Sequence, residues 1–165
     1  MDEDGPFQRA KAAALRLLAQ RPRSEAEVRA HLRRRFPPSA VDRAIASLKE
    51  RGLVDDAAFA ASWKERRDHG SPRSASAIRR ELRSKGVAGA ASEEAVQGVE
   101  DEDAAYRAAV KFSRRLEDAD FASFHRRLWG HLRRRGFGQS IAARTARRLW
   151  DERQARDAPA APAQG

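Results

Sequence analysis

Arginine is the residue type in this sequence whose chemistry and spacing point most directly to a function. Residues 124–150 contain eight arginines and no acidic residue. Spacing on a helix of 3.6 residues per turn places four of them on one face: Arg126, Arg127, Arg133 and Arg134. Because a guanidinium group is always charged and donates several hydrogen bonds, such a face binds phosphates or carboxylates. We therefore expect a surface for a nucleic-acid backbone or for a strongly acidic protein groove.

Two further groups of arginines join the candidate contact residues. They are Arg79, Arg80 and Arg83, and then Arg144, Arg147 and Arg148. The chain has no asparagine, and Gln139 is the only glutamine of the basic stretch, so bidentate reading of adenine is nearly absent. If this surface binds single- or double-stranded DNA, we therefore predict little sequence preference and a steep salt dependence.

Residues suited to catalysis or metal binding are sparse. The four histidines lack metal-binding i,i+4 spacing and have no cysteine partner: His31, His69, His125 and His131. The pair Asp55 and Asp56 could hold a metal or act as acid and base, but its position at a helix start explains both residues. There is no glycine-rich phosphate loop and no nucleophile in a recognisable setting. We expect no enzyme activity, no cofactor and no metal.

Composition limits the class of protein further. The chain has 165 residues, a formal net charge of +10 and no cysteine, which excludes disulfides and fits a reducing cytosol. No apolar run approaches 18 residues, and the acidic start has no apolar signal-peptide core, so we expect a cytoplasmic protein without membrane contact. Half of the residues counted as hydrophobic are alanine. Small local cores are therefore expected rather than one large core.

A period of 50 residues organises the elements that carry the arginines. Leu32, Leu82 and Leu132 stand at its equivalent positions, each within a Leu-Arg phrase. Apolar residues elsewhere follow the helical period, and no alternating strand pattern appears. Such a repeat predicts an all-α chain of three tandem three-helix repeats, which form an elongated, curved molecule.

The predicted boundaries follow from the repeat and from helix start and stop signals. The predicted segments are a flexible N-terminus at residues 1–8, repeats at residues 9–54, 55–100 and 101–150, and a disordered tail at residues 151–165.

Local signals mark the ends of several helices. Ser24 and Glu27 have the spacing of a capping box, and Asp55 suits an N-cap. Gly52 suits the left-handed residue that ends a helix. Residues 71–76, which follow Gly70 and contain Pro72, predict a loose joint between two helices.

The central segment has a specific pattern of residues between Leu48 and Val87. Its members are Gly52, Asp55, Asp56, Phe59, Trp63, Leu82, Lys85 and Gly86. Taken as a whole, this pattern resembles the RecX family of regulatory proteins. Leu132, Gly136, Phe137 and Ile141 are similar to the third repeat of that family, and the resemblance spans residues 9–150.

The resemblance implies a bacterial, all-helical regulator that is not an enzyme. Proteins of this family bind the RecA recombinase and its DNA filament, lie in the groove of the filament, and inhibit filament growth, ATP hydrolysis and strand exchange. By this resemblance we expect a monomer with the RecA filament and DNA as partners, in which the eight residues of the central pattern have structural roles.

Two other functions remain open on the residues alone. A helix-turn-helix transcription regulator also contains three-helix units with a basic helix, and it would bind a particular duplex tightly. An RNA-binding or scaffold module would show a similar charge. The sequence also leaves open whether DNA or protein contacts dominate, and whether filaments are inhibited or stabilised.

Overall fold

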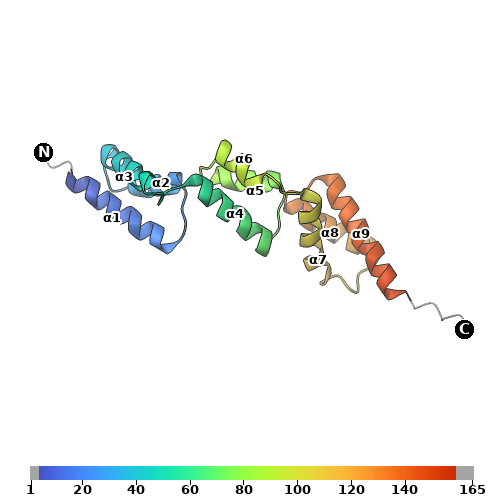
Figure 1. Ribbon diagram of the computed structural model, residues 1–165. Helices are drawn as coiled ribbons and strands as arrows, with labels where there is room; N and C mark the ends of the chain where they lie inside the picture. Colours follow the sequence, from blue (N-terminus) through green and yellow to red (C-terminus); the bar gives the residue numbers. More distant parts are fainter. Residues whose placement is uncertain (1–3, 159–165) are drawn as a thin grey trace, which may run out of the picture. The chain divides into compact units, whose positions relative to one another are not determined.

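Nine α-helices and no strand are found in residues 4–158, the part of the chain that the computed structural model describes (Figure 1). The helices follow one another as three groups of three, so the predicted all-α class with three-helix repeats is confirmed. In order they are α1 (Asp4–Gln20), α2 (Glu25–Leu32), α3 (Pro38–Glu50), α4 (Asp56–Gly70), α5 (Ala75–Ser84), α6 (Ala90–Val96), α7 (Asp101–Ser113), α8 (Phe121–Arg134) and α9 (Gln139–Asp157).

Contacts divide the chain into two compact units. The first contains residues 4–66 and 79–97, and the second contains residues 67–78 and 98–158. The end of α4 and the start of α5 therefore belong to the second unit. The predicted repeat boundaries at residues 54 and 100 stay a prediction. None of the helices in residues 4–158 has the length and the apolar character that a membrane span requires.

Each unit contains a small hydrophobic core. In the first unit, buried side chains of α1, α2 and α3 pack together, including Leu17, Val28, Leu32, Ile45 and Leu48. In the second unit, α7, α8 and α9 enclose Phe124, Leu128, Leu132, Phe137 and Leu149. Alanines make up half of the second core, which lets these helices approach closely. The expectation of small local cores is confirmed for these two clusters.

The predicted helix ends agree with the structure at three places. The Ser24 hydroxyl accepts a hydrogen bond from the Glu27 amide, and the Glu27 carboxylate accepts one from the Ser24 amide, each over 3.2 Å. The Asp55 carboxylate accepts a hydrogen bond from the Ala58 amide over 3.0 Å. Gly52 has a φ of +66°, the left-handed conformation that follows a helix.

The prediction of a flexible N-terminus is wrong from residue 4 onward. Helix α1 begins at Asp4 because side chains of its first turns are held by the rest of the unit. The Arg43 guanidinium forms an ion pair with Asp4 over 2.8 Å and lies over the ring of Phe7. Phe7 also packs against the first core. Residues 1–3 lie outside the described part of the chain.

The predicted disordered tail is also wrong for its first residues. Helix α9 continues to Asp157, stabilised by i,i+4 ion pairs such as that between Arg153 and Asp157. Arg153 also donates hydrogen bonds to the carbonyl oxygens of Leu116 and Ala119, each over 3.1 Å, and lies over the ring of Trp150. The tail prediction for residues 159–165 falls outside the described residues.

One junction is built from the start of α2 and the residues after α5. The Ser24 hydroxyl, which is fully buried, donates a hydrogen bond to the carbonyl oxygen of Lys85 over 2.5 Å. Gly86, with a φ of +77°, lies so close to Ala26 that a Cβ atom at residue 86 would come within 3.0 Å of the Ala26 methyl group. The amide of Glu25 donates to the carboxylate of Asp56 over 2.9 Å.

The second unit contains an equivalent junction. Its Ser74 and Gly136 stand 50 residues after Ser24 and Gly86. The amide of the buried Ser74 donates to the carbonyl oxygen of Arg135 over 3.2 Å. Gly136, with a φ of +90°, would place a Cβ atom 2.6 Å from the Ala77 methyl group. The amide of Ala75 donates to the carboxylate of Asp101 over 2.8 Å.

These contacts show that the prediction of a loose joint at residues 71–76 is wrong. Ser74 caps α5 by accepting a hydrogen bond from the Ala77 amide over 3.1 Å, and Pro72 and Ser74 are buried. Glycine and proline here serve a tight turn between two helices rather than a flexible connection.

Candidate functional site

Helix α8 presents a row of free cationic side chains. Arg126, Arg127 and Arg134 are exposed, and none of the three forms an ion pair with any carboxylate of residues 4–158. Their helix is anchored by the buried residues Phe124, Leu128 and Leu132 on its other face. The Asp120 carboxylate caps α8 by accepting a hydrogen bond from the Ser123 amide over 2.8 Å, and this bond lowers the pKa of Asp120.

Arg133, the fourth arginine predicted for this face, has structural contacts of its own. Its guanidinium donates a hydrogen bond to the carbonyl oxygen of Phe137 over 2.8 Å and lies 5.8 Å from the ring centroid of Trp129. Within residues 4–158, three of the four arginines therefore form no ion pair, and the fourth contacts the residues at the end of α8.

The three arginines predicted on α9 are ion-paired, which corrects the view that no carboxylate opposes the basic stretch. Arg147 pairs with Asp151 over 3.1 Å, and Arg148 pairs with Glu152 over 2.8 Å. Arg144 pairs with Glu102 of α7. The acidic partners lie outside residues 124–150, so counting charges within that stretch missed them. Because exposed pairs are weak, these arginines remain able to exchange partners.

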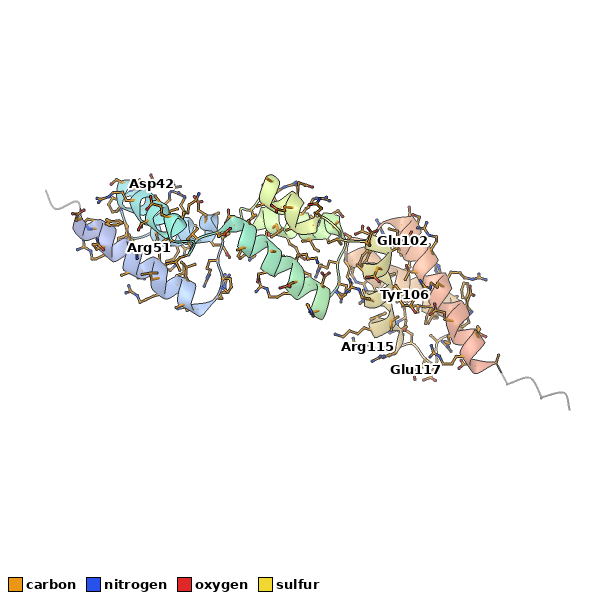
Figure 2. The ribbon with its side chains drawn as sticks, viewed as in Figure 1. Asp42, Arg51, Glu102, Tyr106, Arg115 and Glu117 are labelled. Carbon is orange, nitrogen blue, oxygen red and sulfur yellow. The ribbon has the colours of Figure 1, made fainter. Side chains whose placement is uncertain are left out.

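A cleft of about 860 Å³ lies among α7, α8 and α9, where these ion pairs form its rim. Its lining includes Phe121, which is 39% exposed, and Tyr106, which Figure 2 labels on α7 together with Glu102. The Tyr106 hydroxyl donates a hydrogen bond to Glu152 over 2.9 Å, which raises the pKa of Tyr106. The Arg148 guanidinium lies 4.1 Å from the centroid of the Tyr106 ring.

The three contact arginines predicted on α5 differ in whether they form an ion pair. Arg79 forms an ion pair with Glu93 over 3.0 Å. Arg80 and Arg83 are exposed and form no ion pair within the described chain. Arg83 stands at the repeat position of Arg133, near the end of its helix, where a cation also interacts favourably with the helix dipole.

A third set of free arginines follows α2 and was not among the predicted contact residues. Arg33, Arg34 and Arg35 are exposed and form no ion pair with the residues that the structure covers. They occupy the positions of Arg133, Arg134 and Arg135 in the 50-residue register. The repeat itself was the signal that could have identified them. Exposed arginines without an ion-pair partner in residues 4–158 therefore occur in the first repeat as well as in the third.

The residues of the central pattern form a contact network in the first unit. Trp63 donates its indole N–H to the Glu81 carboxylate over 2.7 Å, and its ring stacks with Phe59 at a centroid distance of 5.9 Å. The cationic groups of Arg66 and Lys85 lie 5.0 Å and 5.4 Å from the centroid of the Trp63 ring. Leu82 is fully buried. The structure places these residues in packing and helix-end roles.

His131 is the histidine with the most distinctive surroundings. Its ring stacks on Phe112 at a centroid distance of 4.0 Å, and its Nε2 atom accepts a hydrogen bond from the Nε–H of Arg135 over 2.8 Å. Burial and the nearby charges of Arg135, Arg134 and Arg115 lower the pKa of His131 to about 4. A neutral imidazole fits the acceptor role. No cluster of metal-binding side chains occurs in residues 4–158.

The pKa of His131 predicts a specific loss of stability in weak acid. Because the unfolded chain takes up this proton near pH 6.5 and the folded chain only near pH 4, stability is lost as pH falls through this window. After allowance for the partial exposure of the ring, we expect His131→Gln to remove about 1 kcal/mol of the destabilisation between pH 7 and pH 5. Urea unfolding of the wild type and of His131→Gln at both pH values measures this difference. If the free energy of unfolding depends on pH equally in the two proteins, the buried neutral imidazole is contradicted.

Similar proteins occur among both curated sequences and solved structures. A family model for the first three-helix domain of RecX matches residues 10–58, and a model for the second matches residues 55–96. The regulatory protein RecX of Streptomyces coelicolor is 35% identical over 151 residues, which cover 89% of this chain and 80% of that protein. The regulatory protein RecX of Mycobacterium ulcerans is 37% identical over 140 residues, covering 82% and 81% of the two chains. The crystal structure of RecX from Lactobacillus salivarius has a TM-score of 0.75 at 21% identity, over 88% of this chain and 97% of that chain, and supports the fold.

Proposed function

Because the chain belongs to the RecX family of regulatory proteins, we propose that it binds the RecA recombinase and its DNA filament. Bound in the groove of the filament, the protein inhibits filament growth, ATP hydrolysis and strand exchange. It acts in the cytoplasm as a monomer and has no catalytic role of its own.

The observation that carries this proposal is that each of the three repeats has exposed arginines without an ion-pair partner in residues 4–158, of which Arg33 and Arg83, and Arg34 and Arg134, stand at equivalent positions. In the described part of the chain, exposed guanidinium groups without carboxylate partners follow α2 and lie on α5 and on α8. A binding surface repeated along one chain suits a partner that is itself a repeating polymer of phosphates and acidic side chains. The family assignment favours this reading over a transcription regulator.

The test is ATP hydrolysis by RecA on single-stranded DNA, with and without this protein. We expect the wild-type protein to inhibit hydrolysis and the triple variant Arg126→Glu, Arg127→Glu and Arg134→Glu to have lost at least tenfold in inhibitory potency. The reason is that charge reversal converts three attractive contacts into repulsive ones, each worth on the order of 1 kcal/mol or more.

A matched variant separates specific contacts from net charge. The changes Arg9→Glu, Arg16→Glu and Arg156→Glu alter the net charge equally at exposed positions of α1 and α9. This control should inhibit nearly as well as the wild type, and circular dichroism should show equal helicity in all three proteins. Full inhibition by the α8 variant would remove α8 from the interface. Absence of inhibition by the wild type would overturn the proposed function.

A further inference from the structure

The second unit contains a small cavity beside His131. Its volume is about 90 Å³, the space of about three water molecules. Its polar lining comes from the turn after α4, from α7 and the residues that follow it, and from α8. We call it the basic cavity, and its polar lining residues are Ser71, Lys111, Arg115, His131 and Arg135.

The charge of the basic cavity is one-sided. Three cationic side chains line it, and none of its lining residues is a carboxylate. Among the described residues, the ammonium group of Lys111 has one polar contact, a long one of 3.4 Å to the carbonyl oxygen of Gly70. Arg115 is exposed where α7 ends (Figure 2) and has no hydrogen-bond or ion-pair partner for its guanidinium in residues 4–158.

Arg135 is held in place while part of its guanidinium remains available. Its Nε–H donates to His131, and one terminal nitrogen donates to the Ser71 hydroxyl. An arginine has five N–H donors, so these two bonds leave donors for a ligand. Burial and the neighbouring charges of Arg73, Arg67 and Arg134 lower the pKa of Arg135, which means that its charge is poorly compensated by the protein. An anion would supply the missing compensation.

One free arginine of α8, Arg134, directly precedes the cavity residue Arg135 in the chain. Arg134 is near enough to lower the pKa of both His131 and Arg135. A polyanion that contacts Arg134 therefore passes close to the cavity, and the small volume admits one oxyanion group rather than a whole nucleotide.

We propose that the basic cavity binds one phosphate group of the DNA backbone, with Lys111, Arg115 and Arg135 as its cationic contacts. This inference rests on the proposed function, because DNA is the phosphate source that the function supplies. Arginine suits this role through its planar, bidentate donor geometry, and the neutral His131 keeps Arg135 oriented.

Binding of a fluorescein-labelled oligothymidylate, followed by fluorescence anisotropy, tests the proposal on the full chain without RecA. The variant Lys111→Gln with Arg115→Gln should bind about tenfold more weakly, as expected for the loss of one charge-assisted contact. The slope of log affinity against log salt should fall in magnitude by about 0.7, the value for one phosphate of a single strand.

Two controls keep the outcome interpretable. The variant Arg114→Gln with Arg156→Gln loses the same charge at exposed positions outside the cavity and should change the affinity less than twofold. The conservative variant Lys111→Arg with Arg115→Lys keeps both charges and should restore most of the binding. Oligothymidylate affinities and salt slopes that are equal in the cavity variant and the charge control would overturn the proposal.

Inorganic phosphate identifies the source of the ligand. At constant ionic strength, replacing chloride with phosphate should shift the NMR signals of the His131 ring in the wild type and leave them unchanged in the cavity variant. Oligothymidylate should cause the same shift. A response to phosphate but not to the oligonucleotide would overturn binding of the DNA backbone.

The same variants also separate this site from the function on which it rests. Normal DNA binding by the cavity variant, combined with lost inhibition of RecA, would assign the cavity to a carboxylate of the recombinase and would also overturn the proposal. Failure of the wild type to inhibit RecA, with cavity-dependent DNA binding intact, would instead overturn only the function.

Discussion

Replacing Gly86 with alanine is expected to lower the free energy of unfolding by about 3 kcal/mol. Two physical effects add at this position. A residue with a Cβ atom in the left-handed conformation costs about 1 kcal/mol, and forcing extra volume into a packed contact costs about 1–3 kcal/mol. The second effect arises because the new methyl group would meet the Ala26 methyl group within 3.0 Å. Thermal and urea unfolding followed by circular dichroism measure the loss.

Gly52 provides the matched control for this prediction. It has a similar φ of +66°, but a Cβ atom added there would meet no atom within 4 Å. Gly52→Ala should therefore cost only about 1 kcal/mol. The double variant Gly86→Ala with Ala26→Gly removes the clashing methyl group and should recover part of the loss. Equal destabilisation by Gly52→Ala and Gly86→Ala would show that the junction with α2 is not tight.

The repeat architecture was predictable because its signals are local and periodic. Ser24, Asp55 and Gly52 act on residues within a few positions of themselves, so capping rules identify them correctly. The leucines at the 50-residue period occupy equivalent buried positions, since one supersecondary unit buries the same face each time. The arginine row on α8 was predictable in the same way from helical spacing.

The pairing of charges could not be read from the sequence in this way. Arg144 meets Glu102, which is 42 residues away, only because α7 and α9 pack side by side in the second unit. The cations of the basic cavity likewise come from separate elements, so neither Lys111 nor Arg115 forms a pattern along the chain. Counting charges in a window detects a basic stretch and misses the carboxylates that folding brings to it.

The repeat register also explains why the junction occurs only twice among the described residues. The position of Gly86 and Gly136 is occupied in the first repeat by Phe36, which packs against the first core. The position of Ser24 and Ser74 is occupied in the third repeat by Phe124, which is buried in the second core. At both places a phenylalanine that packs in or against a core stands where the other two repeats have a junction residue.

Replacing Leu132 with alanine is expected to unfold the second core while the first core survives. Leu132 is fully buried, and deletion of a buried leucine side chain costs about 2–5 kcal/mol. Half of the buried residues in this core are alanines, so the remaining contacts offset little of the loss. Because the two hydrophobic clusters share no residue, we expect hydrogen exchange to accelerate in α7, α8 and α9 and to stay slow in α1 and α3.

Two leucine substitutions check this division. Leu32→Ala removes the equivalent side chain of the first core and should reverse the pattern of exchange. Leu15→Ala, at a position that is 41% exposed, should change neither core by more than about 0.5 kcal/mol. Simultaneous acceleration in all helices of Leu132→Ala would mean that the two cores unfold as one cooperative unit.

The Leu132 variant also separates the two ways in which inhibition of RecA can be lost. Leu132 lies on the buried face of α8, and Arg126, Arg127 and Arg134 are exposed on the same helix. Leu132→Ala should therefore abolish inhibition by releasing the helix that presents the arginines, with accelerated exchange in α8. The charge-reversal variant should lose at least tenfold in inhibitory potency with exchange in α8 unchanged. If both variants lose inhibition with these opposite exchange patterns, the function depends on the arginines, and the leucines act by holding them in place.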